Sequence, residues 1–137
     1  MDELTENIES KINLLELNNA TLYDLPSHIN VPNYDRSKLN AGIVHIGVGN
    51  FHRAHLSWYI HRLLERGLAN NWSIIGGSVR KQDSKMRDKL LSQDFLTTLI
   101  ELDPNGDNHA EIVGAMIDYV PIDEDNKSLI QIMANPQ

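Results

Sequence analysis

GIVHIGVGNFHRAH, residues 42 to 55, carries a short apolar run, then two glycines at positions 47 and 49, and then a segment with helical spacing. This order is typical of a buried parallel strand that turns tightly into a helix facing a phosphate group. Gly47 permits the tight turn, and Gly49 lets the backbone approach a pyrophosphate closely. The helix directs its unpaired N–H groups and its positive dipole end at the anion. The stretch therefore predicts dinucleotide binding.

The general fingerprint has a third small residue where His52 stands, so an ordinary structural turn between strand and helix remains the alternative. The fingerprint also has an acidic residue about 20 positions further on, which bonds the adenosine ribose. Asp83 is the nearest candidate and favours NAD, whereas Arg80 and Lys81 would accept the 2′-phosphate of NADP. These residues would otherwise be solvated loop charges that cap the next helix. The prediction is NAD, with NADP not excluded.

Hydrophobic spacing around this turn predicts alternating elements. They are a helix over 2–17, an irregular arm over 18–40, a strand over 43–47, a helix over 51–67, a strand over 72–79, a helix capped by Asp83 or Ser84, a strand over 95–102, a turn over 103–108, edge strands at 112–113 and 116–120, and a last helix from 123. Strand, helix, strand, helix, strand is the pattern of a doubly wound α/β sheet.

We therefore expect an incomplete doubly wound, Rossmann-like parallel sheet with an N-terminal helix and arm. Residues 1–40 would form the helix and surface arm, and residues 41–137 a truncated NAD-binding domain. A fourth strand would begin where this sequence ends, so the first strand would keep an unpaired edge.

Composition excludes several classes of protein. The net charge is −7, and no basic stripe collects the twelve lysines and arginines, which argues against nucleic-acid binding. There is no cysteine, so disulfides and thiolate metal sites are excluded. No apolar run of 18 residues exists and the first residues are acidic, so we expect no membrane segment and a cytoplasmic location.

Four histidines lie in or near the helix after the turn, namely His45, His52, His55 and His61. Imidazoles at helical spacing can share a metal ion. No carboxylate completes this set and no HExxH motif is present, so no metal site is predicted. His52 and Arg53, at the helix start, are interpreted as polar groups near the phosphates.

Residues 42–55 also resemble the signature of the mannitol dehydrogenase family, which comprises long-chain polyol dehydrogenases and hexuronate reductases. In such proteins a histidine in place of the third glycine, here His52, is a family trait. The resemblance extends from about residue 18 to the end. It includes LNNATL (17–22), PNYDR (32–36), WSI (72–74), Asp83, MRD (86–88), QD (93–94) and IVG (112–114). The MRD and QD segments look most like the branch that interconverts D-mannitol and D-fructose with NAD.

The resemblance implies that Gly47, Gly49, Asn50 and Phe51 form the pyrophosphate loop and that Asp83 selects NAD. Many members have a second acid just before it, where Gln82 stands here. Members of this family work without a metal, using a lysine base with asparagine and histidine in a C-terminal helical domain. That domain is not in this sequence, so no residue here is assigned a catalytic role.

The predicted cofactor-binding set is Gly47, Gly49, Asn50, Phe51, His52, Arg53, Arg80 and Asp83. The predicted function is the NAD-binding portion of a mannitol-oxidising dehydrogenase, inactive by itself. A separate chain is one predicted source of its substrate domain. Alternatives are a non-catalytic nucleotide-binding module, a remnant of a disrupted reading frame, and a hexuronate reductase.

Overall fold

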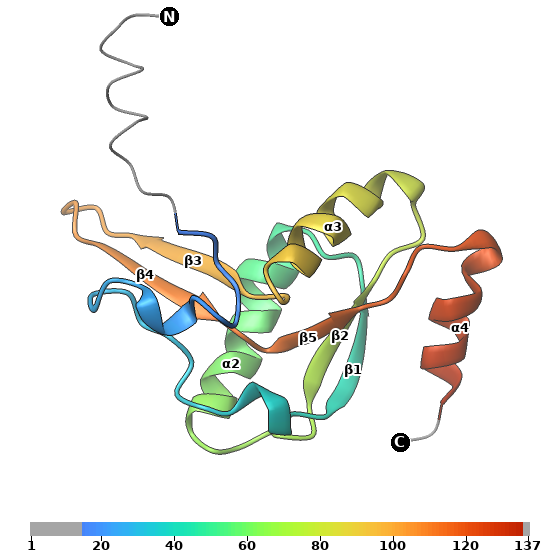
Figure 1. The fold of residues 1–137 in the computed structure, drawn as a ribbon, viewed down its shortest axis with the longest axis horizontal. Coiled ribbons are helices and arrows are strands. Elements are labelled where there is room, and N and C mark those ends of the chain that lie inside the picture. Colours follow the sequence, from blue (N-terminus) through green and yellow to red (C-terminus); the bar gives the residue numbers. More distant parts are fainter. Residues whose placement is uncertain (1–14, 136–137) are drawn as a thin grey trace, which may run out of the picture.

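A three-stranded parallel sheet forms the centre of the structure, a computed structural model that describes residues 15–135 (Figure 1). Its strands are β1 (Ala41–Ile46), β2 (Ser73–Gly77) and β5 (Met116–Tyr119), in the spatial order β1-β2-β5. Both pairings are parallel. This is the order of the first three strands of a doubly wound sheet, so the Rossmann-like fold predicted from the sequence is confirmed.

Helices cover both faces of this sheet (Figure 1). On one face lie a π-helical turn (His52–Leu56), α2 (Ser57–Glu65) and α3 (Ser84–Ser92), and on the other lies α4 (Lys127–Ala134). Consecutive apolar residues in the strands supply both layers of the core. Ile74 packs with Leu90 on the first face, and Ile75 packs with Leu129 on the second. Strands buried on both faces require such continuous apolar runs, which is why the sequence reveals them.

The strand predicted over 95–102 exists, but the prediction that it is the third strand of the parallel sheet is wrong. It is β3 (Thr97–Leu102), which pairs antiparallel with β4 (Asn108–Val113) in a separate two-stranded sheet. The turn between them contains Gly106 with a φ of +89°. Thr97 is buried and Leu99 half-buried, whereas Thr98 and Ile100 are exposed. One face of the strand is therefore solvated, as antiparallel sheets allow, which explains the difference.

The arm over 18–40 is irregular, as predicted, with 3₁₀ turns at Leu22–Asp24 and Arg36–Lys38. Leu22 packs against Leu96 and Ile112 of the hairpin. The Arg36 guanidinium donates to the carbonyls of Asp94, Met116 and Gly114, at 2.7, 2.9 and 3.1 Å. Hydrogen bonds and apolar packing therefore attach the arm to both sheets.

Three further predictions concern helices. The helix predicted over 2–17 falls mostly outside the described residues, and residues 15–17 are not helical. Of the two predicted caps, Asp83 and Ser84, Asp83 stands at the N-cap position of α3, but its side chain makes no capping bond and is bonded to Ser78 and Arg80 instead. The last helix begins as predicted, with a 3₁₀ turn at Glu124–Asn126 leading into α4.

Strand β1 is an edge of the central sheet within residues 15–135, as the sequence predicts for the first strand. None of the helices described is long and apolar enough to span a membrane.

Candidate functional site

The turn after β1 redirects the chain within three residues. Gly47 has a φ of +97°, which L side chains rarely adopt, and its N–H donates to the Gly77 carbonyl at 2.8 Å. Helical geometry begins at Asn50, and the Arg53 N–H donates to the Gly49 carbonyl at 3.1 Å. The N–H groups before Arg53 have no acceptor within the helix, and they follow directly on the carboxyl end of β1.

The first part of this helix is the π-helical turn, which passes directly into α2. The Ser57 N–H closes it by donating to the His52 carbonyl. Such turns insert one extra residue into a helix and are frequent at functional sites. Within the turn His52 is buried at 1% exposure, whereas Phe51 beside it is 69% exposed. Two neighbouring residues of the predicted site therefore differ in accessibility, one being buried and the other exposed.

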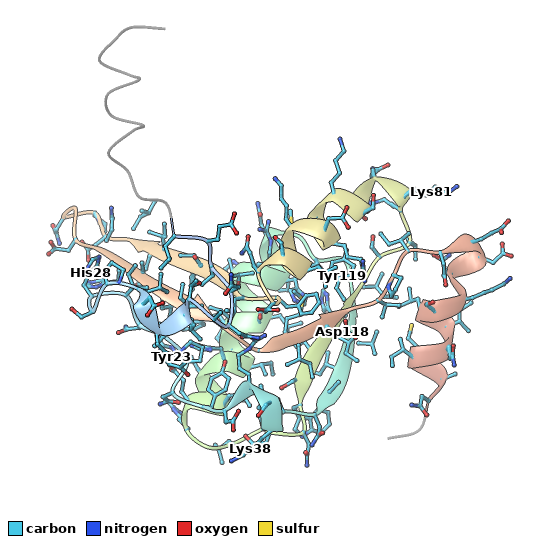
Figure 2. The ribbon with its side chains drawn as sticks, viewed as in Figure 1. Tyr23, His28, Lys38, Lys81, Asp118 and Tyr119 are labelled. Atoms are coloured by element: carbon cyan, nitrogen blue, oxygen red, sulfur yellow. The ribbon has the colours of Figure 1, made fainter. Side chains whose placement is uncertain are left out.

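Six of the eight predicted site residues line one cleft of about 410 Å³. They are Gly47, Gly49, Phe51, His52, Arg80 and Asp83. The cleft opens where the three parallel strands end, and Tyr119 of β5, labelled in Figure 2, forms part of its wall. Lys81, labelled in the same view, is exposed and does not line it. Ligands of open α/β sheets bind in this kind of crevice.

Asn50 and Arg53 are not brought into this cleft. Arg53 Nη2 donates to Asn50 Oδ1 at 2.9 Å, and both residues line an adjacent groove with Lys89 and Gln93. The structure therefore divides the predicted set between two neighbouring depressions.

Arg80 and Asp83 form a two-point ion pair at the rim of the cleft. Arg80 Nη2 and Nε lie 2.9 and 3.0 Å from the two Asp83 oxygens, and the Ser78 hydroxyl also donates to the carboxylate. The Ser78 hydrogen bond, followed by Arg80, lowers the pKa of Asp83 below its ordinary value. Asp83 is therefore an anion held in a fixed orientation, and Arg80 is the cation that neutralises it.

His52 is one of the most buried residues that line the cleft. Its ring meets that of His45 edge to face, with centroids 4.7 Å apart, and neither ring nitrogen has a hydrogen-bond partner. Burial, followed by His45 and Arg53, lowers the pKa of His52 to about 4. At neutral pH the ring is uncharged, so it can offer an N–H to an anion but no positive charge.

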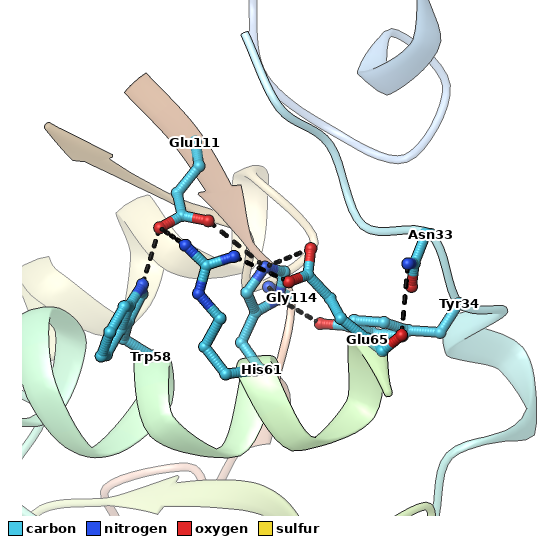
Figure 3. A network of polar contacts seen from close by, with 8 residues as sticks. Asn33, Tyr34, Trp58, His61, Glu65, Glu111 and Gly114 are labelled. Carbon is cyan, nitrogen blue, oxygen red and sulfur yellow. Dashed lines mark hydrogen bonds and ion pairs between the residues drawn. The ribbon is translucent and has the colours of Figure 1, made fainter. Parts of the chain in front are cut away.

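A second polar cluster lies on the far part of α2, around His61 (Figure 3). The expectation that no carboxylate accompanies these histidines is wrong, because Glu65 and Glu111 face His61. The spacing of His61 and Glu65, one helical turn apart, was visible in the sequence. Glu111 was not predictable in this way because it arrives from β4.

The glycine turn, the parallel strand order and the cleft at the strand ends define a dinucleotide-binding domain of the Rossmann type. The family model of the mannitol dehydrogenase Rossmann domain matches residues 41–137, and the chain belongs to the mannitol dehydrogenase family. The family resemblance of the sequence is thereby confirmed.

Its relatives include mannitol 2-dehydrogenase of Cereibacter sphaeroides, 50% identical over 106 residues, which are 77% of this chain and 22% of that protein. A mannitol dehydrogenase of Saccharomyces cerevisiae is 42% identical over 120 residues, which are 88% of this chain and 24% of that protein. The chain thus spans less than a quarter of the length of either relative.

Two solved structures share the fold. Pseudomonas fluorescens mannitol 2-dehydrogenase, in a ternary complex with NAD and D-mannitol, matches with a TM-score of 0.84 and 37% identity, over 89% of this chain and 25% of that one. Substrate-free D-sorbitol dehydrogenase matches with a TM-score of 0.68 and 36% identity, over 75% of this chain and 21% of that one.

Proposed function

We propose that this chain is the NAD-binding part of a mannitol 2-dehydrogenase and that NAD binds in the cleft at the ends of β1, β2 and β5. The observation that carries the proposal is the meeting of the glycine turn with the Arg80–Asp83 pair in one cleft. The likeness to a mannitol 2-dehydrogenase that holds NAD and D-mannitol supports it.

The glycine turn fits the pyrophosphate of a dinucleotide. A Cβ added to Gly47 or Gly49 would meet no protein atom within 4 Å, so the space in front of both glycines is open to a ligand. The N–H groups at the start of the helix are free to donate, and the dipole of the helix favours an anion there. In this proposal the backbone, rather than a lysine or arginine side chain, holds the phosphates.

The Arg80–Asp83 pair fits the adenosine ribose of NAD better than that of NADP. The Asp83 carboxylate can accept hydrogen bonds from the ribose hydroxyls, and its negative charge repels a 2′-phosphate. Arg80 already gives two N–H groups to Asp83, so its charge is largely neutralised before a 2′-phosphate could approach. The Arg80–Asp83 pair therefore favours NAD over NADP in this cleft.

His52 would contribute without charge. Its nitrogens have no protein partner although the ring is 1% exposed. Buried polar atoms are normally bonded, so a ligand group at this place would satisfy one of them. We propose that the neutral ring donates one hydrogen bond to the bound dinucleotide.

NAD supplies the reaction with a hydride acceptor, and the contribution of this chain is to bind and orient it. Oxidation of D-mannitol to D-fructose is the proposed activity of the whole enzyme, and a hexuronate is the alternative substrate class. We propose that the groups that handle the substrate lie in the part of the relatives beyond the matched region, whether on the same chain or a separate one. The proposed location is the cytoplasm.

The test is a calorimetric titration of the chain with NAD and with NADP, repeated with Asp83→Asn. The native chain should bind NAD at least about 10-fold more tightly than NADP, and Asp83→Asn should lose most of that preference. Lys127→Gln, at an exposed position of α4 outside the cleft, should leave both affinities unchanged. A folded chain that binds neither nucleotide, or an unchanged preference in Asp83→Asn, would overturn the proposal.

A further inference from the structure

Three side chains with metal-binding atoms converge on one point beside α2, away from the dinucleotide cleft (Figure 3). His61 Nε2 lies 3.3 Å from Glu65 Oε1 and 3.8 Å from Glu111 Oε2, and the three atoms are all within 4.8 Å of one another. Donors at about 2.0–2.2 Å from a tetrahedral Zn²⁺ ion stand about 3.3–3.6 Å apart. The cluster is therefore close to the geometry of three ligands of one ion.

The two carboxylates are oriented by bonds to their outer oxygens. Arg62 lies 2.9 Å from Glu65 Oε2 and 3.2 Å from Glu111 Oε1, and Trp58 Nε1 donates to the same Glu111 oxygen at 2.6 Å. Each carboxylate thus presents its other oxygen to His61. Groups that fix ligand orientation in this way surround most protein metal sites.

The inner oxygen of Glu111 lacks a hydrogen-bond partner. Glu111 is only 9% exposed, and its Oε2 atom has no donor within hydrogen-bond distance. A buried carboxylate oxygen without a donor is costly unless a cation approaches it. Two carboxylates here face one guanidinium, so the cluster retains negative charge when His61 is neutral.

The His61 ring is held with its Nε2 atom toward the two carboxylates. It is 1% exposed, and its Nδ1 lies 2.6 Å from the Tyr34 hydroxyl, which leaves Nε2 for the carboxylate side. The Gly114 N–H also approaches Nδ1, at 3.4 Å, so this side of the ring is held by two groups. In the proposed site the ion would take the place of a proton on Nε2, at the point where Glu65 and Glu111 converge.

We propose that His61, Glu65 and Glu111 bind a divalent transition metal ion, with Zn²⁺ the best match to one imidazole and two carboxylates. The ion would join α2, which carries His61 and Glu65, to β4, which carries Glu111. It would therefore fasten the β3–β4 hairpin to the layer that holds the cofactor cleft. The site shares no residue with that cleft, so its test is independent of NAD binding.

The test is a titration of the metal-free chain with Zn²⁺ alone, followed by calorimetry, with Co²⁺ absorption as a spectroscopic check on the ligands. We expect one saturable site, a higher unfolding midpoint with Zn²⁺, and reversal by a chelator. Glu65→Gln, the mildest variant because it keeps the side-chain shape, should weaken binding at least about 10-fold, and His61→Ala should weaken it further. His109→Ala, an exposed histidine of β4, is the matched control and should bind like the native chain.

Each other outcome overturns the proposal. A folded chain that shows no saturable Zn²⁺ binding would mean that only a proton occupies the position between His61 and the carboxylates. Binding that Glu65→Gln leaves unchanged, or that His109→Ala reduces equally, would mean an adventitious surface site. A circular dichroism melt of each variant shows that it is folded before its affinity is compared.

Discussion

Gly47 and Gly49 stand two residues apart in one turn, yet different physical requirements act on them. Gly47 holds a φ of +97°, which strains any residue with a Cβ. Gly49 has no such conformation, and the space around its missing side chain is open. The first glycine is therefore required by the backbone, and the second by the proposed ligand.

Alanine at each position should separate these two requirements. Gly47→Ala should lower the free energy of unfolding by about 1–2 kcal/mol, because the new Cβ is strained at positive φ. Gly49→Ala should change it by less than about 0.5 kcal/mol but weaken NAD binding at least about 10-fold, because the methyl group occupies the approach of the pyrophosphate. Urea unfolding and calorimetry measure the two effects, and equal stability loss in both variants would contradict this assignment.

His52 predicts a pH dependence of stability. The folded protein keeps the ring neutral down to its pKa of about 4, whereas the unfolded chain takes up a proton below about pH 6.5. The unfolded state binds more protons between these values, so the contribution of His52 is present above pH 6.5 and lost as the pH falls to 4. The loss should amount to about 3 kcal/mol.

The measurement compares urea unfolding at pH 7 and pH 4 in the native chain and in His52→Leu. Other groups also titrate in this range, so the difference between the two proteins isolates His52. His55→Leu, an exposed position one turn along, serves as the control and should keep the native pH dependence. A His52→Leu curve parallel to the native one would contradict the buried neutral state.

At the scale of elements, Arg36 joins the arm to the rest of the fold through hydrogen bonds to three backbone carbonyls. Replacement by lysine should lower the free energy of unfolding by about 2 kcal/mol or more, because an ammonium group cannot reproduce the fork of bonds to three carbonyls. Lys38→Arg, at an exposed position of the same 3₁₀ turn, should have no measurable effect. Thermal unfolding tests the pair, and equal stability of the native chain and Arg36→Lys would show that the arm is fastened by its apolar contacts alone.

The elements differ in how far the sequence could predict them. Strands β1 and β2 and the helices of the central layers have local signatures, namely continuous apolar runs, helical spacing and the glycine turn, and they were predicted within a few residues. The partner of Thr97–Leu102 was not predictable in this way, because pairing depends on a second segment rather than on the strand itself. The same limit explains why Glu111 was missed beside His61, and why the bonds of Asp83 to Ser78 and Arg80 were not predicted.

At the scale of the whole molecule, the central sheet places its carboxyl edge, the glycine turn and the Arg80–Asp83 pair around one cleft. The exposed edge of β1 is on the side where a doubly wound sheet continues with its fourth strand. We therefore propose that further chain, covalently attached or not, pairs with β1 and completes the site on the nicotinamide side. In the same proposal, residues of the cleft such as Arg80 and Asp83 form the adenosine side.

The central claim is that this cleft binds NAD in preference to NADP, and the thermal unfolding midpoint tests it most directly. Circular dichroism melts of the chain alone, with saturating NAD, and with the same concentration of NADP would be compared. Only binding to the folded state raises the midpoint, and a ligand at 100 times its Kd stabilises by about 2.7 kcal/mol. The account predicts one cooperative transition that NAD raises by several degrees and NADP raises less. A cooperative transition that ignores both nucleotides, or that NADP raises more than NAD, would contradict it.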